Sequence, residues 1–110
     1  MNHGDTDAAV NDLANQLQNG IGAGGIGPGL AWYSIRGSAV AFVCNRGTRQ
    51  PTVLPSVVGN GNAAITSACG SYIAGTWRID PEYYIDYGYM VMEPGLDFCG
   101  HAEGSGSGSC

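Results

Sequence analysis

The chain has 110 residues, of which 44% are hydrophobic and 12% are charged, and its formal net charge is −5. This length predicts a single domain over residues 1–110, and the hydrophobic fraction excludes a disordered acidic protein. The chain has no lysine and only four arginines, which excludes nucleic acid as a partner, and its uncharged stretch over 13–35 is too rich in glycine for a membrane span.

The first predicted element is a helix over residues 5–18. Ala9, Leu13 and Leu17 recur there at helical spacing, and Asp5 or Thr6 is the expected N-cap. The glycine-rich segment that follows matches G-x-G-x-x-G over 22–27, but it follows a helix where a dinucleotide fold requires a strand. No cofactor is therefore expected.

Residues 30–44 predict a β-hairpin, because two runs of aromatic and β-branched residues flank a short turn that contains Gly37. The second run is apolar on both faces, which is typical of a central strand. The polar stretch over 45–55 is expected to be an exposed loop, and it carries Arg46 and Arg49 as candidate contact residues.

A short second helix is predicted over residues 62–74, with Asn60 or Asn62 as its cap. Residues 76–99 then predict three further strands separated by turns, the last of them over 96–99. The expected fold class is α+β: a small antiparallel sheet or sandwich of about five strands, stapled by disulfides, with an N-terminal helix.

Four cysteines without any C-x-x-C motif predict two disulfides and no zinc site. Three connectivities are possible, and the favoured one pairs Cys44 with Cys69 and Cys99 with Cys110, which ties down a tail over 100–110. Disulfides imply an oxidising compartment, so we expect a secreted, extracellular protein. Since residues 1–5 have neither a basic start nor an apolar run, the chain is interpreted as a mature form with a replacement initiator methionine.

No catalytic constellation is expected. His101 is the only histidine outside the N-terminal segment, no G-x-S-x-G elbow occurs, and all four cysteines are assigned to disulfides. Asp97, Cys99 and His101 alternate along one segment, but one histidine and one carboxylate make too small a metal shell. The prediction is a protein that is not an enzyme and holds no metal.

A cluster of tyrosines and methionines is the most informative functional signal, because both residue types are enriched where protein surfaces meet. One face of the predicted strand over 83–92 is expected to pack on the core, and the other, which carries Met90 and Met92, is too apolar to be left fully exposed. One interpretation is that the second helix covers this second face. The other is a homodimer or partner interface, for which the candidate residues are Trp77, Tyr83, Tyr84, Tyr87, Tyr89, Met90 and Met92.

Several short motifs follow the opening helix and the glycine-rich loop: AFVC over 41–44, ACGSYIAGTW over 68–77, YGYM over 87–90 and FCG over 98–100. With them the chain resembles small secreted cysteine-rich effector and elicitor proteins of filamentous fungi, the class that includes necrosis-inducing and killer-toxin-like folds. The resemblance implies secretion, a compact α+β sandwich and non-enzymatic recognition of a protein receptor or a cell-surface or cell-wall component. The alternative function is a lectin-like carbohydrate binder that uses Trp77 and the tyrosines over 83–89.

Overall fold

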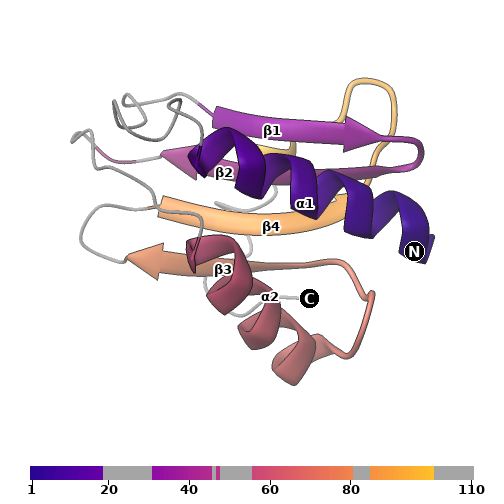
Figure 1. Ribbon diagram of the computed structural model, residues 1–110. Helices are drawn as coiled ribbons and strands as arrows, with labels where there is room; N and C mark the ends of the chain where they lie inside the picture. The colour runs from indigo at the N-terminus through magenta and orange to yellow at the C-terminus, as the bar shows by residue number, and fades with distance from the viewer. Residues whose placement is uncertain (19–30, 46, 48–55, 81–84, 101–110) are drawn as a thin grey trace.

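The computed structural model describes residues 1–18, 31–45, 47, 56–80 and 85–100. Its elements follow the order α1 (His3–Gln18), β1 (Ala31–Arg36), β2 (Ala39–Asn45), α2 (Ser56–Cys69), β3 (Gly75–Asp80) and β4 (Ile85–Val91) (Figure 1). Neither helix of the described chain has the length and apolar character of a membrane span.

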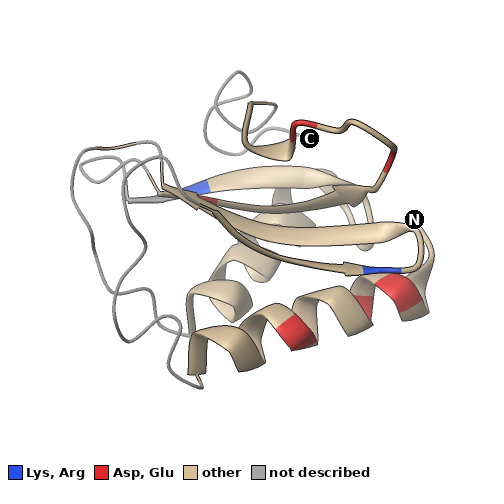
Figure 2. Cartoon of the chain, turned by 90° about the horizontal axis from the view of Figure 1, so that it is seen from above, with Lys and Arg blue, Asp and Glu red and all other residues tan. Residues whose placement is uncertain are grey.

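Within these residues the strands form one antiparallel sheet with the order β1-β2-β4-β3. Both helices lie on one side of the sheet, and the segment after β4 lies on the other (Figure 2). The α+β class, the N-terminal helix and the hairpin are confirmed. The described residues contain four strands where the sequence predicted about five. The predicted strand over 96–99 is wrong, since residues 98–100 are helical and Asp97 accepts the Gly100 N–H at 3.0 Å.

The start of α1 differs from the prediction because Asn2 is its cap. The Asn2 side-chain oxygen accepts the backbone N–H of Asp5 at 2.9 Å, as an N-cap does. Asp5, which was expected as a possible cap, instead accepts hydrogen bonds from the backbone N–H and the hydroxyl of Ser38, both at 2.9 Å. This carboxylate therefore ties the first turn of α1 to the turn between β1 and β2.

Helix α2 begins six residues before the predicted start and ends at Cys69 instead of residue 74. Asn60 and Asn62 therefore lie inside the helix and do not cap it. The helix contains glycine at position 61 because a side chain would not fit there: a Cβ on Gly61 would lie 2.3 Å from the Tyr87 ring. The close approach of α2 to β4 has overridden the low helix propensity of glycine.

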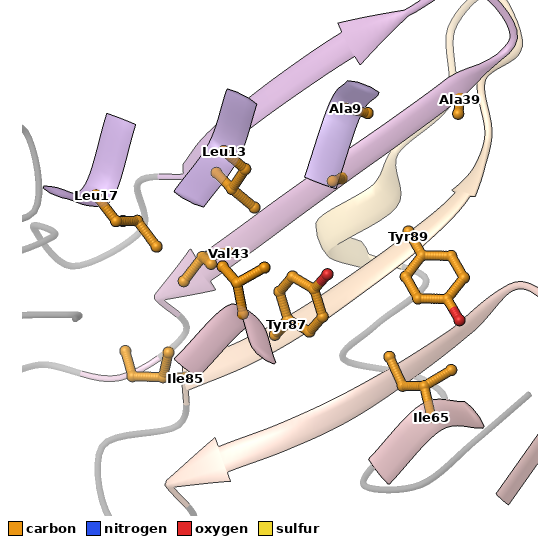
Figure 3. Packing of buried hydrophobic residues seen from close by; sticks show 11 residues of the cluster. Ala9, Leu13, Leu17, Ala39, Val43, Ile65, Ile85, Tyr87 and Tyr89 are labelled. Carbon is orange, nitrogen blue, oxygen red and sulfur yellow. The ribbon is translucent and has the colours of Figure 1, made fainter. Parts of the chain in front are cut away.

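The main core lies between the helices and the inner face of the sheet (Figure 3). It joins Ala9, Leu13 and Leu17 of α1 and Val58 and Ile65 of α2 to alternate side chains of β2 and β4, which are Ala39, Ala41, Val43, Ile85, Tyr87 and Tyr89. On the opposite face, Val40, Phe42 and Cys44 form a second cluster that is covered by Met90, Met92, Leu96, Phe98 and Cys99. Strand β2 is thus buried on both faces, as its apolar sequence predicted.

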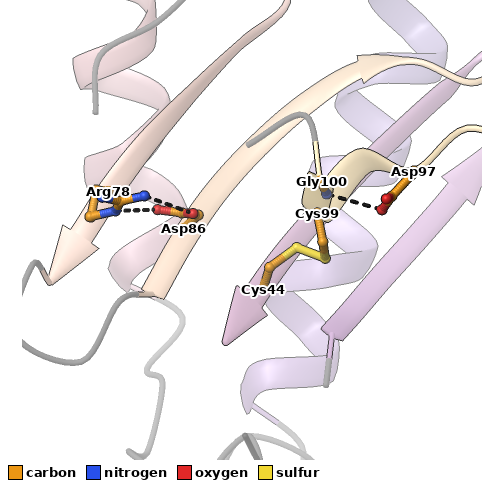
Figure 4. Close-up of a disulfide and its surroundings, with 6 residues drawn as sticks. All are labelled: Cys44, Arg78, Asp86, Asp97, Cys99 and Gly100. Carbon is orange, nitrogen blue, oxygen red and sulfur yellow. Dashed lines mark hydrogen bonds and ion pairs between the residues drawn. A yellow bond between two sulfur atoms is a disulfide. The ribbon is translucent and has the colours of Figure 1, made fainter. Parts of the chain in front are cut away.

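A disulfide between Cys44 and Cys99 fastens the segment after β4 to this outer face (Figure 4). The predicted pairings of Cys44 with Cys69 and of Cys99 with Cys110 are therefore wrong. Cys69 is also in a disulfide, whereas Cys110 lies outside the described residues. Spacing along the chain did not predict the pairing because residues 96–99 fold back across β2, which brings Cys99 next to Cys44.

Candidate functional site

A pocket of about 190 Å³ opens between the two helices. It is lined by Thr6, Asp7 and Val10 of α1, by Asn62 and Thr66 of α2, by Ser71 and Tyr72 of the turn after α2, and by Tyr89 of β4. All but one of these side chains carry a hydroxyl, amide or carboxylate group. The pocket therefore combines hydrogen-bonding groups with apolar side-chain surface, and it borders the main core.

Tyr72 is held in an unusual conformation at this pocket. Its φ angle is 58°, and it is the one residue other than glycine with a positive φ in the described chain. Its hydroxyl donates to both carboxylate oxygens of Asp7 at 3.0 Å, and the His3 ring stacks on it with a centroid distance of 3.7 Å. The hydrogen bond to Asp7 raises the pKa of Tyr72 because it favours the protonated phenol. These contacts join the turn after α2 to the first turns of α1.

Two tyrosines of β4 support the pocket from the sheet. The Tyr87 hydroxyl donates to the side-chain oxygen of Asn62 at 2.5 Å, so the amide N–H groups of Asn62 are not used by this bond. Burial raises the pKa of both Tyr87 and Tyr89, because it disfavours the charged phenolate. Both phenols are neutral at physiological pH, and among the described residues that line the pocket, Asp7 is the only one with a carboxylate or a basic group.

Two residues of the predicted interface on the tyrosine and methionine strand, Tyr87 and Tyr89, are not exposed. Tyr87 is fully buried and Tyr89 is 4% exposed, because both helices cover the face of β4 that carries them. Trp77, Met90 and Met92 are half-buried against the two core clusters. The face of this strand that carries Met90 and Met92 is not covered by α2, as one interpretation expected. Both helices lie on the other side of the sheet, and the segment after β4 packs on this face instead (Figure 2).

Other predicted residues lie outside the described part of the chain: Tyr83, Tyr84, Arg46, Arg49 and His101. Among the residues that are described, no group of three potential metal ligands comes together. Asp86 is buried and accepts the Arg78 Nε–H at 2.8 Å on the outer face of the sheet, so its carboxylate serves an ion pair (Figure 4).

The structure also reveals a surface that sequence reasoning missed, on the outer face of β1. Tyr33 is 50% exposed and Ile35 is 39% exposed. The Tyr33 ring contacts Phe98 with centroids 5.4 Å apart, and Phe98 stacks on Phe42 with centroids 5.0 Å apart. The alternation of Tyr33 and Ile35 with Trp32 and Ser34 was visible in the sequence, but which face the chain covers was not.

Strand β1 is also an edge of the sheet, since β2 is its only neighbour among the described strands. An edge strand presents backbone N–H and C=O groups to which another strand can pair. The outer face of β1 therefore combines exposed apolar side chains with backbone hydrogen-bonding groups.

Comparison of the chain with protein-family models, with curated proteins and with solved structures finds no match.

Proposed function

We propose that this protein is a secreted, non-enzymatic effector or elicitor that acts by binding a partner protein through the outer face of β1. The observation that carries the proposal is the exposure of Tyr33 and Ile35 on an edge strand. Tyrosine is among the residues that contribute most to binding energy at protein interfaces.

Secretion is supported by the Cys44–Cys99 disulfide, which joins β2 to the segment that covers the outer face. Disulfides persist in oxidising compartments and are rare in the cytosol. Cys44 belongs to the second cluster and Cys99 packs against it. The packing of this cluster therefore depends on the disulfide, which an oxidising extracellular environment maintains.

The charge near β1 indicates the chemistry of the partner. Asp5 and Asp12 of α1 contact the β1–β2 hairpin, Asp5 through Ser38 and Asp12 through Arg36, and the chain carries a net charge of −5. Asp12 forms an ion pair with Arg36 at 3.1 Å, which neutralises the arginine of β1. Complementary charge accelerates association, so the partner suited to this surface is a protein with an extended apolar segment flanked by basic residues.

The proposal is tested by saturable binding of the labelled protein to the surfaces of plant and fungal cells. Because the chain has no lysine, an amine-reactive dye labels only the N-terminal amino group. The double variant Tyr33→Ser/Ile35→Thr should bind at least about 10-fold more weakly, as expected for loss of an aromatic anchor. Ile73→Thr is the matched control, since Ile73 is 49% exposed and lies outside β1. Equal binding by the double variant and the wild type contradicts the proposal.

The same double variant also tests the homodimer predicted from the sequence, because the partner that pairs with the edge of β1 could be a second copy of this chain. Light scattering on the wild type and on the double variant separates the cases. A dimer that the double variant loses identifies a second copy as the occupant of this face. A dimer that persists in the double variant places the dimer contact elsewhere and leaves the outer face to another partner.

A further inference from the structure

We propose that the pocket between α1 and α2 binds one ring of a neutral saccharide. This site is distinct from the outer face of β1, because the helices and the outer face lie on opposite sides of the sheet (Figure 2). The sequence had suggested a carbohydrate site at Trp77 and the tyrosines over 83–89, of which Tyr83 and Tyr84 lie outside the described residues. Tyr87 and Tyr89 are too buried to present their ring faces, and the pocket places different residues around a possible ligand.

The lining supplies the mixture of hydrogen-bonding groups that a saccharide requires. Each sugar hydroxyl donates one hydrogen bond and accepts others, so its site needs donors and acceptors side by side. The hydroxyls of Ser71 and Thr66 offer both, the amide of Asn62 offers N–H donors, and the carboxylate of Asp7 accepts strong charge-assisted bonds. A site for an anion requires basic groups, and none of the described lining residues carries one.

The conformation of Tyr72 is a second and independent indication of a binding site. A left-handed φ costs free energy in a residue with a side chain, and residues held in such conformations cluster at binding sites. The Asp7 carboxylate and the His3 ring hold Tyr72 from α1, and Cys69, three residues earlier, is fixed by a disulfide. The Tyr72 ring is thus fixed beside the pocket before any ligand arrives, which lowers the entropic cost of binding.

The volume of the pocket limits the ligand to one ring. Pockets for drug-sized molecules measure about 300–1,000 Å³, whereas this pocket measures about 190 Å³. A ligand of a dozen heavy atoms that binds with ordinary efficiency has a dissociation constant of about 1 mM. We therefore expect weak binding of a single sugar and stronger binding only where a glycan presents several copies.

An alternative ligand is a quaternary ammonium ion, which aromatic rings and a carboxylate also attract. The pocket favours the saccharide because most of its lining residues carry a hydroxyl or amide group beside apolar surface, and because His3 already occupies one face of the Tyr72 ring. Tetramethylammonium is therefore included in the test as the competing probe.

The experiment measures binding of the methyl glycosides of glucose, galactose, mannose and N-acetylglucosamine by saturation-transfer NMR and by calorimetry. At least one glycoside should bind with a dissociation constant of about 1 mM. Asp7→Asn keeps an acceptor for the Tyr72 hydroxyl but removes the charge, and it should weaken binding by about 10-fold. Ser71→Trp fills the pocket from an exposed position and should abolish binding, whereas Tyr33→Ser on the outer face should leave binding unchanged.

Circular dichroism establishes that each variant is folded, and because residue 71 is exposed, Ser71→Trp keeps the test valid if Asp7→Asn does not fold. The proposal is overturned if no glycoside binds at about 20 mM, well above the expected dissociation constant. Binding of tetramethylammonium without any glycoside, or glycoside binding that survives Ser71→Trp, also overturns it.

Discussion

Replacing both Cys44 and Cys99 with alanine should remove much of the stability of the fold. The two residues are 55 positions apart in the sequence, and cross-linking a loop of that length lowers the entropy of the unfolded chain by the equivalent of about 4 kcal/mol. A domain of this size has a total free energy of unfolding of about 5–15 kcal/mol, so the loss is a large share. The expected fall in melting temperature is about 15–20 °C.

Thermal and urea unfolding followed by circular dichroism measure this effect. The double variant avoids an unpaired thiol, and alanine keeps an apolar group at the fully buried Cys44 position. Glu93→Gln, at an exposed site in the same segment, is the control and should leave the midpoint unchanged. Peptide mapping of the wild type should recover Cys44 and Cys99 in one cross-linked peptide. A loss of less than about 1 kcal/mol would refute the view that this disulfide stabilises the segment over the outer face.

Two further predictions concern the contact between α1 and the β1–β2 turn. Gly37→Ala should cost about 1–3 kcal/mol in denaturant unfolding, because Gly37 has a φ of 56° and a Cβ there would lie 2.4 Å from the Asp5 carboxylate. Gly59→Ala, in α2 with open space around it, is the control and should be neutral or stabilising; equal effects at the two sites contradict the reasoning. Ser38 holds the pKa of Asp5 below 3.8, so the stability from this contact is present at neutral pH and is lost as the pH falls through the lowered folded value. Stability measured between neutral and acid pH should therefore decline more steeply in the wild type than in Asp5→Asn, and parallel curves would contradict this assignment.

Local patterns in the sequence predicted the elements whose signals are strong. The helical spacing of Ala9, Leu13 and Leu17 located α1, and the apolar character of both faces of 39–44 identified β2 as a central strand. The start of α2 could not be predicted in this way. Its helix passes through Gly59 and Gly61, and Gly61 is accommodated because it packs against Tyr87, a residue 26 positions later in the chain.

The candidate sites were harder to predict because they depend on tertiary structure. Tyr72 has helical spacing from Cys69, so the sequence placed it within a helix, whereas the chain turns after Cys69 and directs Tyr72 to Asp7 of α1. The exposure of Tyr33 likewise depends on which face the helices cover. The pairing of Cys44 with Cys99 depends on the path of the segment after β4, which no local pattern encodes.

The central claim is that the outer face of β1 is the binding surface of an extracellular protein. Its most direct test is the saturation curve of labelled wild-type protein on cells, compared with the Tyr33→Ser/Ile35→Thr variant under the same conditions. We predict saturable wild-type binding that falls at least about 10-fold in the variant and weakens as salt screens the acidic surface near β1. Saturable binding with the same affinity in both proteins would contradict the claim.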